Sequence, residues 1–143
     1  MRAVLDSTIL VSAYFTPFGL SDEILTLARA GAFRICVSLP ILLEVERVLH
    51  TTKRRRIHPY PDEEITRYLN LLGIVAEVVI DLPPISGIVR DPNDDMVLAS
   101  AVAGAAKYIV SRDKDLLSLR RYESIDIVAP ESFIHILRRG QGS

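Results

Sequence analysis

The sequence contains very little cysteine. Its single cysteine, Cys36, cannot form an internal disulfide, and it lies in the apolar run at residues 33–37. A buried thiol that acts as a small hydrophobic side chain is the expected role there. No cysteine and histidine spacing of a zinc site is present, and the three histidines show no pairing pattern. These absences argue against a disulfide scaffold, a zinc protein and a catalytic thiol.

Long hydrophobic runs and an excess of one charge are also missing. No stretch approaches the ~18 uninterrupted apolar residues of a membrane span. The first apolar run, residues 3–5, meets Asp6 at once and does not resemble a signal peptide. Lysine plus arginine totals 17 against 18 aspartate plus glutamate, a formal net charge of −1 that gives no bulk attraction to nucleic acid or to membranes. We therefore expect a cytoplasmic protein without membrane contact.

No internal repeat or Gly/Ser linker divides the chain. A length of 143 residues, of which 49% are hydrophobic, fits one compact domain with a buried core. We expect residues 1–139 to form this domain and residues 140–143 to be a disordered tail.

Short apolar runs alternate with segments of helical periodicity. Strands are predicted at residues 3–5, 33–37, 74–80, 107–111 and 125–128. Helices are predicted at 21–30 with Ser21 as N-cap, from Ser38 to the basic stretch at 53–56, at 62–72 with Gly73 at the end, at 91–105 and at 130–138. This alternation predicts an α/β fold with a mainly parallel sheet covered by helices on both faces.

Two aspartates directly follow predicted strands. Asp6 follows residues 3–5, and Asp113 follows residues 107–111. Either one alone is explained by a turn or a helix cap. In a parallel sheet, however, both lie at the edge where ligands of open α/β sheets bind, so their coincidence favours a site.

Three more aspartates crowd the start of the helix at 91–105. Asp91 has the position of a cap, and one acid is enough to interact with the helix dipole. A projection at ~100° per residue places Asp94 on the apolar stripe and Asp95 at its border. Asp94 is therefore expected to point inward, where it would need a counter-charge.

The second predicted helix carries Glu44 and Glu46, each at a border of its apolar face. The projection does not choose between them, and a solvated helix flank explains either one. The basic residues 53–56 that follow could contact a nucleic-acid backbone, although a solvated loop also accounts for them.

If Asp6, one of the two glutamates, Asp94 and Asp113 converge, their repulsion raises some pKa values or opens the site unless a cation binds. Mg²⁺ or Mn²⁺ suits carboxylate ligands better than zinc. Such sites usually hold phosphates, and in nucleases the metal activates water for attack on a phosphodiester. The acids thus predict hydrolysis without a nucleophilic side chain.

Four segments, in this order, resemble those of the PIN-domain nucleases: residues 4–13, 38–49, 90–99 and 108–117. Within that family the chain is most similar to toxins of prokaryotic toxin–antitoxin systems, and the resemblance covers nearly the whole chain. It implies a compact three-layer α/β/α sandwich and an Mg²⁺- or Mn²⁺-dependent endoribonuclease. It also implies an RNA substrate, a protein antitoxin that covers or fills the acidic cleft, and a homodimer.

The resemblance also places the metal ligands, on Asp6, Glu44, Asp94 and Asp113. It selects Glu44 over Glu46. Alignment from Asp113 backward against more distant members would favour Asp95 as the third acid, so Asp95 stays a candidate catalytic residue beside Asp94.

Three nearby residues bear on this assignment. Thr8 stands where the family often has asparagine, which alters the hydrogen bonds that orient Asp6. Asp115 adds charge at the rim of the site or caps a helix. Ser111 could hold a water or an acid, although a strand-end serine needs no such role.

Two other classes of protein also have an aspartate at the end of a strand, and both require further residues near it. A receiver-type module needs a second acid beside the strand-end aspartate, and a haloacid-dehalogenase-like phosphatase needs an aspartate two residues after it. Asp6 is followed by Ser7 and Thr8 instead. A catalytically inactive PIN-like protein is the strongest alternative, and the intact set of acids argues against it.

Overall fold

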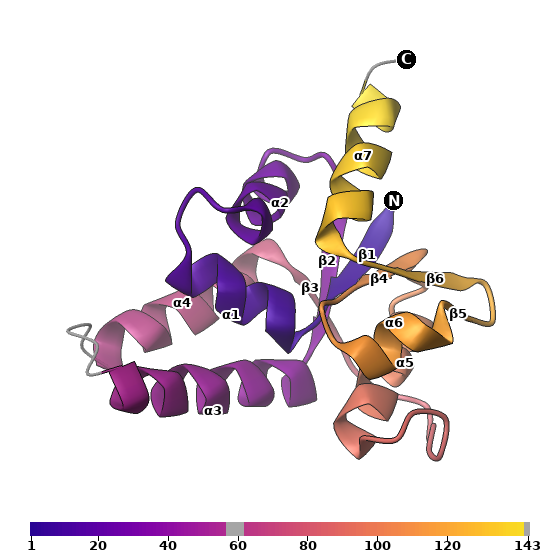
Figure 1. Cartoon of the computed structure of the whole chain (residues 1–143), viewed down its shortest axis with the longest axis horizontal. Helices are drawn as coiled ribbons and strands as arrows, with labels where there is room; N and C mark the ends of the chain where they lie inside the picture. Colours follow the sequence, from indigo (N-terminus) through magenta and orange to yellow (C-terminus); the bar gives the residue numbers. More distant parts are fainter. Residues whose placement is uncertain (57–61, 142–143) are drawn as a thin grey trace.

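The structure is a computed structural model that describes residues 1–56 and 62–141 (Figure 1). Within these ranges the side chains of residues 52–56 and 141 are not described. The predicted nucleic-acid contact of the basic residues 53–56, and the end of the predicted tail at residues 142–143, therefore lie outside the description.

A six-stranded sheet in the order β3-β2-β1-β4-β6-β5 forms the centre of the described structure. Its strands are β1 (Arg2–Leu5), β2 (Arg34–Ser38), β3 (Glu77–Val79), β4 (Tyr108–Val110), β5 (Arg121–Tyr122) and β6 (Ile125–Val128). All neighbouring strands pair in parallel except β5, which pairs with β6 antiparallel. The central strands are almost wholly buried, as expected where helices cover both faces of a parallel sheet.

Helices connect the strands and flank the sheet (Figure 1). They are α1 (Ser7–Phe15), α2 (Leu20–Arg29), α3 (Leu39–Arg56), α4 (Asp62–Val75), α5 (Pro92–Ala103), α6 (Lys114–Leu119) and α7 (Pro130–Gln141). On one side, α1 packs against α2 and α3, α3 against α4, and α2 against α7. α5 packs against β1, β2 and β4. The predicted α/β fold, a mainly parallel sheet between helical layers, is confirmed.

Two helices were not predicted from the sequence. α1 follows β1 immediately, and its buried Ile9, Leu10 and Ala13 are interleaved with the partly buried Val11 and Tyr14. Because apolar residues surround most of this helix, it lacks the polar face that identifies an amphipathic helix. α6 spans only six residues, too few for a clear period.

Several predicted boundaries were wrong. The helix predicted at residues 21–30 corresponds to α2, which begins at Leu20 after the N-cap Gly19. Ser21, the predicted N-cap, is instead buried within α2. α4 continues through Gly73 to Val75, so the strand predicted at 74–80 is reduced to Glu77–Val79. α7 likewise continues beyond residue 138 to Gln141. α5 ends at Ala103, before Ala105, which has a positive φ of 49°.

Within the described ranges, no helix has both the length and the apolar character that crossing a bilayer requires.

Candidate metal centre

The carboxyl ends of β1 and β4 lie side by side. Leu5 pairs with Val110 in parallel register, and the backbone N–H of Asp6 donates to the carbonyl of Val110 at 3.2 Å. Asp6 and Ser111 therefore follow their strands at the same level of the sheet. This is the edge at which the sequence predicted a site.

The side chain of Asp6 is held by three donors, two at the start of α1 and one directly after β4. Its Oδ1 accepts the hydroxyl of Thr8 at 2.5 Å and the backbone N–H of Ile9 at 3.3 Å, and its Oδ2 accepts the hydroxyl of Ser111. Asp6 is only 3% exposed. Burial raises the pKa of Asp6 to about 6, against the opposing effect of these hydrogen bonds. Thr8 thus helps to orient Asp6.

Asp113 lies next to Asp6 and is connected to it through Ser111. The backbone N–H of Asp113 donates to the Ser111 hydroxyl at 2.9 Å, while that hydroxyl donates to Asp6. The carboxylate of Asp113 caps α6 by accepting the N–H of Leu116 at 3.1 Å. Ser111 is fully buried, so one hydroxyl fixes the spacing of both acids.

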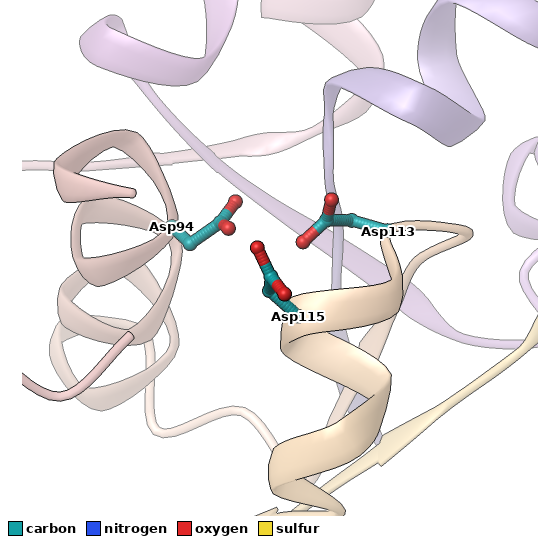
Figure 2. Close-up of side chains that lie close together, drawn as sticks. All are labelled: Asp94, Asp113 and Asp115. Carbon is teal, nitrogen blue, oxygen red and sulfur yellow. The ribbon is translucent and has the colours of Figure 1, made fainter. Parts of the chain in front are cut away.

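Asp94 reaches the same place from α5. Figure 2 shows its carboxylate pointing toward Asp113 and Asp115, and one oxygen from each of the three lies within 4.8 Å of the others. Burial and the adjacent Asp113 raise the pKa of Asp94 to about 7. Asp94 is partly buried, as expected for a carboxylate that faces a pocket.

Asp95 points elsewhere and is more buried than Asp94, in contrast to the helical projection. Its two carboxylate oxygens accept the backbone N–H groups of Gly87, Ile88 and Val89 at 2.8 to 3.2 Å. It is 4% exposed and does not line the pocket that contains Asp94. The structure therefore places Asp95 as an anchor of the preceding loop, apart from the other candidate acids.

Glu44 reaches the pocket from α3, whereas Glu46 on the same helix is exposed. The carboxylate of Glu44 is paired with Arg47, at 2.6 Å to one guanidinium nitrogen and 3.3 Å to another. Arg47 is itself exposed. Because an exposed ion pair contributes little free energy, Arg47 does not prevent Glu44 from taking another partner.

These acids line one pocket of about 180 Å³. Asp6, Glu44, Asp94 and Asp113 all contribute to its wall, together with Asp91 and several apolar side chains, Pro40, Ile41, Met96 and Val97. Within the described part of the chain, no lysine, arginine or histidine forms an ion pair with Asp6, Asp94 or Asp113. Of the four candidate acids in the pocket, only Glu44 is paired with a cationic side chain of the described residues, Arg47.

The donor set fits a hard divalent cation. Carboxylate oxygens are the ligands that Mg²⁺ and Mn²⁺ prefer, and the oxygens of Asp94, Asp113 and Asp115 are close enough for one ion to contact more than one of them. Asp6 borders this cluster and its charge contributes to the raised pKa of Asp94. A bound divalent ion would relieve the repulsion that these neighbouring acids otherwise experience.

Sequence and structure comparisons agree with this architecture. The model of the PIN domain family matches residues 2–115, and the chain belongs to this family of nucleases. A chain of VapBC2 from Rickettsia felis, whose crystal structure contains a DNA fragment from the promoter, is similar in fold: TM-score 0.63, 17% identity, 90% of this chain and 98% of that chain covered. PAE2754 from Pyrobaculum aerophilum is also similar, with TM-score 0.59, 16% identity, and 97% and 90% covered. No match is found among curated protein sequences.

The sequence patterns did not predict the side-chain partners of the acids. The pairing of Glu44 with Arg47 follows from their i,i+3 spacing on a helix, which was a signal available in the sequence. The pairing of Asp115 with Arg90, at 3.3 Å, joins residues 25 positions apart and left no local signal.

Proposed function

We propose that the protein is a metal-dependent endoribonuclease, and that Asp6, Glu44, Asp94 and Asp113 form its metal-binding site. The observation that carries this proposal is the convergence of these four acids, from four separate elements, on one pocket. Asp6, Asp94 and Asp113 lie close together without an ion pair to the described residues, and their mutual repulsion costs free energy in the absence of a ligand. Membership of a nuclease family supports the same chemistry.

A bound Mg²⁺ or Mn²⁺ would supply activation of water and stabilisation of negative charge on the phosphodiester. The residues of the chain would position the ion and shield it from bulk solvent. Asp94 and Asp113 present oxygens from facing elements, and Ser111 and Thr8 hold Asp6 in one orientation. Apolar side chains of α3 and α5 line the remaining wall and limit access of bulk water. Asp95 does not line this pocket and is proposed to support the site from outside.

We further propose that the nuclease is the toxin of a toxin–antitoxin pair. The similar fold of VapBC2, a toxin–antitoxin complex, supports this assignment. In this proposal RNA is the substrate, and a protein antitoxin inhibits cleavage by covering or filling the acidic pocket. We expect the protein to form a homodimer and to act in the cytoplasm.

The test is cleavage of single-stranded RNA by the purified protein. We expect cleavage with Mg²⁺ or Mn²⁺, none in excess EDTA, and loss of activity in Asp6→Asn. Glu46→Gln is the matched control, because it removes an exposed carboxylate from the same helix as Glu44. RNA cleavage that persists in EDTA would refute the proposal.

An inactive PIN-like protein is separated from this proposal by metal titration. Calorimetry with Mn²⁺ should detect binding to the wild type and a large loss of affinity in Asp94→Asn. Absence of binding to both would support the inactive alternative. A receiver-type module is disfavoured, because Ser7 and Thr8 follow Asp6 where such a module needs a second acid.

A further inference from the structure

The loop before α5 is tied to that helix by Asp95. Gly87 donates its backbone N–H to Oδ2 at 3.0 Å, and Ile88 and Val89 donate theirs to Oδ1 at 3.2 and 2.8 Å. Gly87 has φ of +72°, a conformation that glycine adopts without strain. Three consecutive amides thus converge on one buried carboxylate.

This arrangement is not needed to begin the helix. Asp91 already caps α5 by accepting the N–H of Asn93 at 2.9 Å, and Pro92 occupies the first helical turn. Burial of Asp95 at 4% exposure costs free energy that its three hydrogen bonds offset. These hydrogen bonds fix the backbone of the loop and therefore the backbone position of Arg90, the residue that follows it.

Arg90 brings a positive charge to the rim of the acidic pocket. Its side chain is 87% exposed, and a guanidinium nitrogen lies 3.3 Å from Oδ2 of Asp115. Asp115 belongs to the carboxylate cluster with Asp94 and Asp113 shown in Figure 2. The loop anchored by Asp95 therefore places the exposed guanidinium of Arg90 beside the candidate metal centre.

A polyanionic substrate needs such a charge. The acids of the pocket repel RNA, and phosphates of the strand that lie outside the metal site would need a cation from the protein itself. A guanidinium donates two parallel hydrogen bonds to a phosphate, and an exposed ion pair such as that with Asp115 contributes little free energy. Arg90 could therefore leave Asp115 and bind a phosphate at little cost in free energy.

We propose that Arg90 binds a phosphate of the RNA strand next to the scissile bond, and that Asp95 is the positioning residue that holds Arg90 there. This inference rests on the proposed ribonuclease function. It assigns Arg90 to substrate binding and leaves metal binding to the acids.

The test is multiple-turnover cleavage of a labelled single-stranded RNA of mixed sequence in Mn²⁺. We expect Arg90→Gln to raise KM about tenfold with kcat nearly unchanged, because it removes a contact made equally to substrate and transition state. The slope of log(kcat/KM) against log salt concentration should become shallower by about 0.7, the value for one phosphate contact on a single strand. Arg90→Lys should keep the salt slope of the wild type, and its KM should lie between those of the wild type and Arg90→Gln.

Arg138→Gln is the matched control. Arg138 is an exposed arginine on α7 with a single ion pair of similar length, 3.2 Å to Glu23. Its removal changes net charge equally and should leave KM and the salt slope at the wild-type values. Mn²⁺ affinity measured by calorimetry should not fall in either glutamine variant.

Asp95→Asn tests the positioning role. The asparagine amide turns an N–H group toward one of the three backbone donors, which releases the loop. KM should rise as in Arg90→Gln, and in the Arg90→Gln background the same change should add little. A residue that only stabilises the fold would act additively in the double variant and would leave the salt slope unchanged.

The outcomes distinguish the two proposals. A wild type that cuts RNA, with Arg90→Gln equal to it in KM and salt slope, overturns this inference and leaves the ribonuclease proposal standing. A wild type that cuts no RNA overturns both.

Discussion

The hydroxyl of Ser111 connects the two acids at the ends of β1 and β4. It donates to Asp6 and accepts the backbone N–H of Asp113 at 2.9 Å, in a fully buried position. Removal of this hydroxyl leaves a buried carboxylate oxygen and a backbone amide without their partner. The arrangement of the site therefore depends on a residue that binds no metal itself.

We predict that Ser111→Ala lowers the free energy of unfolding by about 1–3 kcal/mol, the cost of an unsatisfied buried polar group. Urea denaturation measures it. Ser132→Ala, at an exposed position of α7, is the control and should change stability by less than about 0.5 kcal/mol. Equal stability of both variants would show that the hydroxyl does not support Asp6.

The raised pKa values of Asp6 and Asp94 predict a pH dependence. Burial raises the pKa of Asp6 from 3.8 to about 6, and burial together with Asp113 raises the pKa of Asp94 from 3.8 to about 7. Between the unfolded and folded values the folded state binds more protons. The contribution of these groups to stability is therefore full below about pH 4 and is lost as pH rises to about 7.

Mn²⁺ requires the ionised carboxylates, so its affinity should increase over the same range. The increase in melting temperature caused by saturating Mn²⁺ should accordingly be larger at about pH 8 than at about pH 5.5. Scanning calorimetry at both values measures this difference. An equal or larger shift at the lower pH would contradict the assignment of these two acids to the metal site.

At the scale of elements, the sequence predicted the strands and amphipathic helices best. β1, β2 and β6 are short apolar runs with polar stops, and their patterns identify them. α1 and α6 were missed because the first lacks a polar face and the second is a short segment held by its Asp113 cap. Local pattern carries little information about such segments, which tertiary packing stabilises.

Two glycines at helix positions show how packing decides what a residue does. Gly104 ends α5, and a Cβ there would lie 2.9 Å from Sγ of Cys36 and 3.1 Å from Cγ1 of Val79. Gly73 lies inside α4, where a Cβ would meet nothing within 4 Å. The sequence suggested a helix end at Gly73, yet only Gly104 has a close contact that excludes a side chain.

We predict opposite effects of alanine at these two positions. Gly104→Ala forces α5 away from β2 and β3 and should destabilise the protein by about 1–3 kcal/mol. Gly73→Ala restricts the unfolded chain and favours the helix, so it should stabilise the protein by about 0.5–1 kcal/mol. Thermal or urea unfolding of the two variants checks both signs. Destabilisation by Gly73→Ala would indicate that α4 does not continue through this residue.

At the scale of the whole molecule, the site exists because the parallel sheet aligns strand ends that are far apart in sequence. Asp6 and Asp113 could be placed at one edge from strand order alone, since both follow parallel strands. The choice between Asp94 and Asp95 was harder, because α5 buries residues on several sides and its stripe is poorly defined. The hydrogen bonds of Asp95 to residues 87–89 are tertiary contacts that no helical projection represents.

The proposed function requires that acids far apart in the sequence form one divalent-metal site. Anomalous diffraction from crystals of the protein equilibrated with Mn²⁺ tests it most directly. We expect a manganese peak at about 2.2 Å from carboxylate oxygens of Asp94 and Asp113, between the bond lengths typical of Mg²⁺ and of Ca²⁺. Manganese bound only elsewhere, or none at saturating concentration, would contradict it.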